Sequence, residues 1–286
     1  MTPRLATLIG GNGDIGRHLQ ARLRREGWTV WLAPRDDDAE LCRRPLGHVF
    51  YCAGLTADYA ERPHDTVEAH ASLLNRVLRD ARFESLVYLS STRLYDGLGE
   101  IDATEDLALR LAPEDPRHLY DLSKALGESL CRVAGHGRAR VARLSCVWSD
   151  DPDGSGFLPE LIRRVRACRA AGNGSERRRL PVDASPGMRR DYIHIDDALD
   201  ALLALATHHE FAIYNVASGR NVDNARLFDL LGAAGGCELV PSRSDASLPM
   251  PRVSVARMAE TFGWRPAGVL ARLAAIFDKE RACSHS

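Results

Sequence analysis

The sequence predicts an α/β fold in which a doubly wound parallel sheet is followed by a smaller C-terminal lobe. Short apolar runs typical of buried strands alternate with amphipathic helical segments as far as about residue 150. A glycine-rich turn joins the first strand to the first helix. Glycines and prolines then break the segment 150–190 into short pieces, which we expect to form loops over the strand ends.

The first elements have the order strand, helix, strand. Residues 5–9 are an apolar run that predicts a buried strand. Apolar residues then recur every four positions within 14–26, which indicates a helix, and residues 28–33 predict a second strand. The same patterns predict strands at 48–53, 86–89 and 140–144 and helices over about 67–81 and 118–134.

The composition is that of an ordinary globular protein. Its 286 residues correspond to about two domains, and 45% are apolar and 27% charged. A net charge of −1 provides no basic field for a nucleic acid. No stretch reaches the ~18 apolar residues of a membrane span, and the N-terminal apolar run is too short for a signal peptide. We therefore expect a soluble protein that binds neither nucleic acid nor membrane.

Cysteine usage points to the compartment. The seven cysteines are scattered along the chain, and none form a Cys-x-x-Cys pair. This pattern predicts no metal or redox site and favours the reducing cytoplasm.

The turn after the first strand has glycines at the spacing of a dinucleotide site. Gly10, Gly13 and Gly16 would permit a tight turn, close approach of a pyrophosphate and packing of the helix on the strand. The N–H groups of Asp14 and Ile15 would open the helix toward the anion. The glycines fit two known spacings, so they predict a Rossmann-type nucleotide site without naming the enzyme family.

Tyr120 and Lys124 lie four residues apart, so they share a face of the predicted helix. A nearby ammonium favours the phenolate and lowers the pKa of a tyrosine, which makes Tyr120 a candidate general acid or base. The chain has only two lysines, and about 0.05 such Tyr-x-x-x-Lys matches are expected by chance. Residues 90–92 carry hydroxyls at the carboxyl end of a parallel strand, where such sheets place their ligands.

Further motifs extend over nearly the whole chain. In order, they are the glycine turn, Tyr88 to Tyr95, Tyr120 with Lys124, Arg190 to Asp197, Tyr214 to Gly219 and Phe262 to Pro266. Together they resemble the extended short-chain dehydrogenase/reductase family, which contains nucleotide-sugar epimerases, dehydratases and ketoreductases. The resemblance implies an NAD(P)-dependent enzyme that acts on a nucleotide-linked sugar.

The resemblance also implies roles for individual residues. Tyr120 would transfer the proton, Lys124 would lower its pKa and hold the nicotinamide ribose, and Ser91 would hydrogen-bond the substrate oxygen. Ser91 is preferred to its neighbours because it stands four residues before Tyr95, the spacing of the family. The predicted cofactor contacts are Gly10, Gly13, Asp14, Ile15, Gly16, Arg35, Ala53 and Lys124, and the predicted substrate contacts are Ser91, Thr92, Cys146 and Arg190.

Positive charge concentrates between residues 163 and 190. This segment holds nine arginines (163, 164, 166, 169, 177, 178, 179, 189 and 190) against two acids. Such an excess suits a substrate diphosphate, which the resemblance places at Arg190. The alternative is a solvated basic face in an arginine-rich protein.

The chain departs from the family at the adenine side of the cofactor. The connection between residues 33 and 48 is too short for the further strand and helix that the family usually has, so this unit is trimmed. Arg35 stands at the tip of the second strand, where it can pair with a 2′-phosphate. We therefore expect NADP(H) to be preferred, while Asp36 beside it keeps NAD(H) open.

Two further departures bear on the substrate. Cys146 and His70 stand where the family usually has asparagines, which points away from an ordinary UDP-hexose. We expect Cys146 to be a buried thiol and not a nucleophile.

The reaction is narrowed by Thr92 and Arg93, which replace the Asp-Glu pair that sugar dehydratases of the family carry. Without those carboxylates a dehydratase lacks its second acid and base. Hydride transfer at a single carbon remains, and Arg35 and the short chain favour a ketoreductase, which we expect to act at C4 of the sugar. The alternatives are an epimerase that retains its NAD and a non-catalytic NADP-binding regulator, which would typically lack the Tyr120–Lys124 pair.

We expect residues 1–150 to form the dinucleotide-binding Rossmann domain and 151–286 the smaller substrate-binding lobe, with parts of 190–215 returning to the sheet. The family resemblance also suggests a homodimer. Its interface would be a four-helix bundle made by the helices near 67–81 and 118–134 of two copies.

Overall fold

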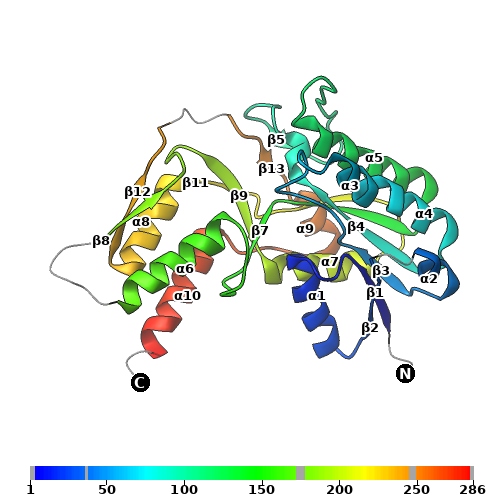
Figure 1. Ribbon diagram of the computed structural model, residues 1–286, viewed down its shortest axis with the longest axis horizontal. Helices are drawn as coiled ribbons and strands as arrows, with labels where there is room; N and C mark the ends of the chain where they lie inside the picture. Colours follow the sequence, from blue (N-terminus) through cyan, green and yellow to red (C-terminus); the bar gives the residue numbers. More distant parts are fainter. Residues whose placement is uncertain (1–3, 36–37, 172–177, 245–248, 284–286) are drawn as a thin grey trace.

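The computed structural model describes residues 4–35, 38–171, 178–244 and 249–283. Figure 1 shows a central sheet with its helices at one side of the molecule and a smaller lobe at the other. The N-terminus lies beside the sheet, and the C-terminus lies at the lobe. The predicted α/β fold, a doubly wound parallel sheet with a smaller C-terminal lobe, is confirmed.

The central sheet has six strands. They are β1 (Leu5–Ile9), β2 (Thr29–Leu32), β3 (His48–Tyr51), β4 (Ser85–Ser91), β6 (Ala139–Leu144) and β10 (Ile213–Val216). Their order is β10-β6-β4-β3-β1-β2, and every neighbouring pair is parallel. The strand order reverses at β1, because β2 lies on one side of it and β3 on the other. Such a reversal opens a crevice at the carboxyl ends of the strands, where these sheets bind ligands.

Helices cover both faces of the central sheet. They include α1 (Asp14–Arg25), α4 (Leu73–Asp80), α5 (His118–Ala134) and α7 (Ile195–Ala206). Figure 1 shows α1 and α7 on one face and α4 and α5 on the other. Leu19 and Leu202 belong to the apolar core on the first face, and Leu74 and Cys131 to that on the second. The sheet is therefore buried on both faces, as its continuous apolar strands require.

The helix predicted over 67–81 consists of three pieces. These are α3 (Pro63–Val67), a π-helical turn η1 (Glu68–Ser72) and α4. The π turn contains His70, whose exposure is 0%. π turns inside helices frequently mark functional sites.

The connection between β2 and β3 is short. Its described residues contain α2 (Asp38–Arg43) and no further strand, so β2 forms the edge of the central sheet. The carboxyl end of β4 continues into a 3-10 turn η2 (Thr92–Tyr95). A small pair, β5 (Asp102–Ala103) with β13 (Arg252–Val253), and α9 (Ala256–Phe262) complete this half.

The segment 150–190 holds more regular structure than expected. It contains α6 (Phe157–Ala170), β8 (Arg178–Val182) and the start of β9 (Arg189–His194), so the prediction of loops was wrong. The proline of α6 lies in its first turn, where a missing N–H breaks no helical bond. Leu158, Ile162 and Val165 recur at helical spacing and are buried. This helical pattern was overlooked because glycines lie on both sides of it.

The C-terminal lobe consists of α6, β8 and β9 together with β7 (Cys146–Trp148), β11 (Asn221–Asp223), α8 (Asn224–Gly235), β12 (Cys237–Pro241) and α10 (Val269–Cys283). β7, β9 and β11 form one small sheet, and β8 pairs with β12 in another. The lobe has an apolar core of its own, which includes Trp148, Val165, Leu231 and Phe277. β10 lies between β9 and β11 in the chain yet joins the central sheet, so the boundary at residue 150 stays a prediction.

Among the described helices, none is both long and apolar enough to cross a membrane.

Candidate active site

The glycine turn forms a cradle at the carboxyl end of β1. Gly10 has a φ of +80°, and a Cβ there would lie 2.5 Å from the backbone nitrogen of Ala53, which follows β3. A Cβ on Gly16 would lie 2.7 Å from the Cα of Gly11. Any side chain at these two positions would displace backbone, so the close approach of β1, β3 and α1 requires glycine.

The first N–H groups of α1 open toward this cradle. Gly13 is the N-cap residue of the helix and has no side chain to bond them. A Cβ on Gly13 would meet only the Gly10 carbonyl oxygen, at 3.4 Å. The N–H groups that follow, at Asp14 and Ile15, thus form an N-terminus suited to a phosphate. The residues present fit the pyrophosphate of a dinucleotide.

Arg35 lies just beyond the end of β2, at the edge of the sheet, and is exposed. Its position leaves the guanidinium accessible to a phosphate on the adenosine ribose. Asp36, which would favour NAD, lies outside the described residues.

Tyr120 and Ser91 are brought together at the carboxyl end of the sheet. Tyr120, in the first turn of α5, is 5% exposed, and the Ser91 side chain at the end of β4 is near enough to its phenol to favour the phenolate. Burial raises the pKa of Tyr120, while Ser91 and the Arg93 guanidinium act in the opposite direction. The neighbouring Ser90 instead donates to Glu128 at 2.6 Å. Ser91 is therefore the hydroxyl that faces the tyrosine.

Lys124 lies one turn further along α5 and is 4% exposed. Its ammonium donates to the Leu89 carbonyl at 2.8 Å and lies 5.9 Å from the centre of the Tyr120 ring. Burial lowers the pKa of Lys124 to about 7.

His70 lies at the site, although its only predicted feature was that it replaces an asparagine of the family. Its Nε2 accepts from the Leu55 N–H at 3.2 Å, so its Nδ1 carries the proton and donates to the Ser123 hydroxyl at 2.8 Å. Its ring stands edge-on to that of Tyr120, with centroids 5.2 Å apart. Burial lowers the pKa of His70 to about 3, so the ring is neutral. The π turn that places it left no signal in the apolar pattern.

Several motif residues stabilise the fold behind the site. Arg143 on β6 forms a buried pair with Glu128, with contacts of 2.6 and 2.9 Å, and donates to the Tyr95 hydroxyl at 2.7 Å. Tyr95 in turn donates to the Asn215 side chain at 2.8 Å. This network joins α5, η2, β6 and β10, and buried polar networks of this kind hold their elements in one arrangement when every member is bonded.

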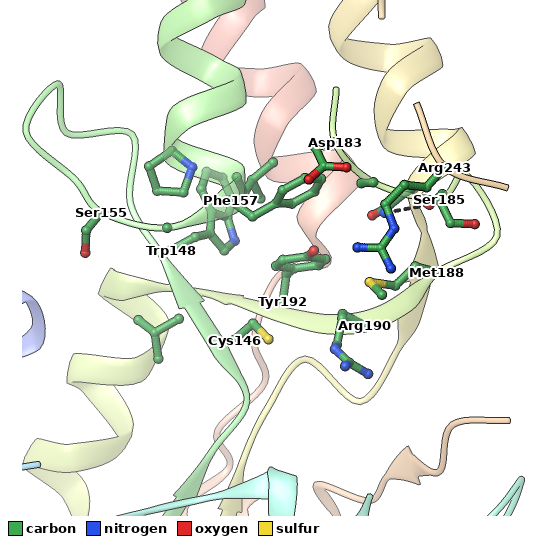
Figure 2. Close-up of a pocket in the computed structure, with 16 residues that line it drawn as sticks. Cys146, Trp148, Ser155, Phe157, Asp183, Ser185, Met188, Arg190, Tyr192 and Arg243 are labelled. Carbon is green, nitrogen blue, oxygen red and sulfur yellow. Dashed lines mark hydrogen bonds between the residues drawn. The ribbon is translucent and has the colours of Figure 1, made fainter. Parts of the chain in front are cut away.

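A cavity of about 400 Å³ lies in the C-terminal lobe. Its walls come from β7, β9, the start of α6 and the segments after β8 and β12. Figure 2 shows Phe157 and Tyr192 in the wall and Arg190 and Arg243 toward one side. Aromatic rings with converging cations suit a nucleoside diphosphate. Arg243 was missed because it lies far from the other lining residues in sequence.

Cys146 begins β7, opposite Tyr192 on β9, and lines this cavity. Its thiol is exposed, so the prediction of a buried thiol was wrong. The thiol is exposed because its side chain lies in the wall of the cavity and faces open space. The surrounding protein still raises its pKa to about 11, so the thiol stays protonated. Leu144, two residues before Cys146, pairs with Ser91 at the end of β4, so this end of the cavity lies toward the hydroxyl that faces the tyrosine.

The arginines between 163 and 190 have separate roles. Of those that the structure describes, only Arg190 lines the cavity. Arg166 and Arg169 pair with Glu280 at 2.6 and 3.5 Å, and Arg179 pairs with Glu238. Arg177 lies outside the described residues. The cluster expected at a diphosphate therefore reduces to Arg190 at the cavity.

A model of the NAD-dependent epimerase/dehydratase family matches residues 6–217. The chain belongs to this family. Membership confirms the family predicted from the ordered motifs, and with it an NAD(P)-dependent enzyme of the epimerase and reductase kind.

Relatives in the family resemble the chain over most of its length. A protein named "Probable GDP-L-fucose synthase 1", of Oryza sativa subsp. japonica, is 24% identical over 91% of this chain and 86% of its own. A dTDP-6-deoxy-L-talose 4-dehydrogenase (NAD(P)(+)) of Kitasatospora kifunensis is 26% identical over 92% and 91%. The solved structure of RMD from Pseudomonas aeruginosa complexed with NADPH matches with a TM-score of 0.76, at 24% identity, over 96% of this chain and 98% of that one.

Proposed function

We propose that the protein is an oxidoreductase that reduces the C4 keto group of a nucleotide-linked sugar, with Tyr120 as proton donor. One observation carries the proposal: Tyr120 and Ser91 lie at the carboxyl end of the sheet, with the nucleotide cradle on one side and the start of the cavity wall on the other. Lys124 lies one turn further along α5, and a Cβ built on Gly54, next to Ala53 at the cradle, would lie 3.2 Å from its Nζ. On the other side, Ser91 pairs with Leu144, two residues before Cys146 in the wall of the cavity.

The chain supplies the proton half of the reaction. The hydroxyls of Ser91 and Tyr120 would both hydrogen-bond the keto oxygen of the sugar. Tyr120 then donates its proton to that oxygen and is left as a phenolate, while the carbonyl carbon becomes that of a secondary alcohol. A bound nicotinamide dinucleotide supplies the hydride that this carbon receives.

NADP(H) is the proposed cofactor. The exposed Arg35 at the tip of β2 supports this preference, because its guanidinium can pair with the 2′-phosphate that distinguishes NADP from NAD. The NADPH complex of the similar Pseudomonas protein agrees with it.

The proposed substrate places its diphosphate and base in the lobe's cavity and its sugar at Tyr120. Arg190 would hold a phosphate, and Phe157 and Tyr192 would contact apolar surface. The names of two relatives, a 4-dehydrogenase and a 4-dehydro-6-deoxy-D-allose reductase, support C4 as the reacting carbon.

A homodimer through α4 and α5 is part of the proposal. Leu126 and Val133 on α5 are 50% and 78% exposed, and a helix-to-helix contact would cover them. Light scattering on a size-exclusion column should give a molar mass twice that of the chain. The double variant Leu126→Glu, Val133→Glu should give the mass of a single chain.

The first experiment separates reduction from epimerisation. The purified protein is denatured, any released nicotinamide nucleotide is identified by chromatography, and the emptied protein is titrated with NADPH and NADH. The proposal expects little retained cofactor and tighter binding of NADPH, with the preference lost in Arg35→Ala. Near-stoichiometric retained NAD would instead favour the epimerase, and no binding of either would contradict both.

A further inference from the structure

Arg93 lies over the catalytic tyrosine. It comes from η2, two residues after Ser91, and its side chain is 31% exposed. The carbon at the centre of its guanidinium lies 4.9 Å from the centre of the Tyr120 ring, within the range of a cation–π contact. The Lys124 ammonium is further away, at 5.9 Å. Arg93 is thus the nearer of these two cations to the ring.

Several segments hold the guanidinium in place. Its Nη2 donates to the Tyr59 hydroxyl at 3.0 Å and to the Arg117 carbonyl at 2.7 Å, and its Nε lies 3.2 Å from the Asp121 carboxylate. The guanidinium also covers the Tyr59 ring, at 4.8 Å. The loop after β3, the segment before α5 and α5 itself therefore fix the cation over Tyr120.

We propose that Arg93 is a positioning residue that stabilises the phenolate which Tyr120 becomes when it gives up its proton. This rests on the proposed function only for the direction of proton transfer. A cation over an aromatic ring is attracted to its face, and it attracts a negatively charged ring more strongly. Arg93 would thereby make Tyr120 a stronger acid at the moment when the keto oxygen needs the proton.

Arg93 and Lys124 differ in how their charge depends on pH, which explains why Arg93 is useful beside Lys124. An arginine stays charged throughout the working range of pH, whereas burial lowers the pKa of Lys124 to about 7. In the protein alone, the Lys124 charge therefore disappears as the pH rises, and the Arg93 charge does not.

The other groups around Tyr120 do not replace Arg93. His70 is neutral, and the Asp121 carboxylate opposes a phenolate. By pairing with Asp121, Arg93 also offsets this repulsion. Among the described residues, the titratable and charged groups that interact with the tyrosine are Tyr59 after β3, His70 on η1, Tyr88 on β4, Arg93 on η2, Asp121 and Lys124 on α5, and Cys146 on β7.

The test is a direct titration of the Tyr120 phenol in the full chain. The protein is labelled with 3,5-difluorotyrosine, whose phenol titrates near neutral pH, and followed by fluorine NMR from pH 6 to 10. The Tyr120 resonance is identified by its loss in Tyr120→Phe. The variants are Arg93→Gln, Arg93→Lys and, as a control, Arg79→Gln, which removes an exposed arginine that pairs with Asp80 on α4.

The expected result is a fall of about tenfold in the acid dissociation constant of residue 120 in Arg93→Gln. Arg93→Lys should recover most of this change, and Arg79→Gln should match the wild type. An unchanged titration in Arg93→Gln would overturn the proposal. An equally large change in the acid dissociation constant in Arg93→Lys would also overturn it, because Arg93 would then act through packing and not through charge.

Two precautions keep the outcome decisive. Arg93→Gln leaves the buried Asp121 unpaired, so the titration is repeated in Arg93→Gln with Asp121→Asn, compared with Asp121→Asn alone, in case the single variant fails to fold. The titration uses no sugar and no cofactor. A failure of the proposed ketoreductase activity therefore leaves the result on Arg93 standing, and the reverse is also true.

Discussion

The two halves of the molecule build their binding surfaces in different ways. At the central sheet, the cradle is made of backbone: Gly10 and Gly16 allow the close approach, and the uncapped N–H groups of α1 are the contacts. In the C-terminal lobe, the cavity is made of side chains such as Arg190 and Tyr192. A backbone site fails when a side chain is added, whereas a side-chain site fails when one is removed. We propose that Tyr120 acts between the two, so changes in the three places should have separable effects.

The largest effect is expected at the junction itself. Tyr120→Phe removes the proton donor and keeps the ring, so turnover should fall by about 10²–10⁴-fold. Cofactor binding should stay within a small factor of the wild type, as measured by fluorescence titration with NADPH. Full turnover in this variant would contradict the role of Tyr120 as the proton donor.

The cradle is the next test. Gly10→Ala places a methyl group against the Ala53 backbone, so the cradle must shift, and NADPH binding should weaken by more than about tenfold, or about 1.4 kcal/mol. Gly27→Ala is a matched control, since Gly27 also has a positive φ, of +81°, but nothing lies within 4 Å of its Cβ position. Both variants carry backbone strain, so equal losses of NADPH affinity would contradict the cradle.

Changes in the cavity should affect the KM for the sugar and not the binding of NADPH. Arg190→Gln should raise the KM for a nucleotide-linked sugar by about 10–100-fold, the usual range for a lost hydrogen bond to a charged group. The dissociation constant for NADPH should not change. Arg179→Gln, an exposed arginine on β8 that pairs with Glu238, is the control in the same lobe. A KM that rises equally in both variants would mean that general positive charge attracts the substrate.

The smallest effect concerns stability and pH. Burial lowers the pKa of Lys124 from 10.5 to about 7, so between these values the unfolded chain binds a proton that the folded protein does not. Stability contributed at this position must therefore rise with pH in that window. Below pH 7, Lys124→Met should have a larger free energy of unfolding in urea than the wild type. This difference should shrink between pH 7 and 9. Lys279→Met, at the other lysine, should run parallel to the wild type, and parallel curves for both variants would contradict the lowered pKa.

The same contrast explains how much the sequence could predict. The sheet, α1 and α5 follow from apolar periodicity, and the cradle follows from glycine spacing, because backbone requirements leave marks at fixed local distances. Tyr120 and Lys124 were found for the same reason, since one helical turn separates them.

Side chains that meet across the fold left no such marks. Arg243 reaches the cavity from a segment remote from β7 and β9, and His70 reaches Tyr120 through a π turn that apolar periodicity does not reveal. Arg93 was noted only for the carboxylate it replaces, although its guanidinium covers the tyrosine. α6 was missed because flanking glycines were read as breaks in the whole segment.

The most direct test of the central claim is deuteride transfer. The protein is incubated with GDP- or dTDP-linked 4-keto-6-deoxyhexoses and NADPH deuterated at both C4 positions of the nicotinamide, and the sugar product is analysed by NMR and mass spectrometry. We expect one deuterium at C4 of the product for each NADPH oxidised, and none with Tyr120→Phe. No oxidation of NADPH with these sugars, or turnover that persists in Tyr120→Phe, would contradict the account.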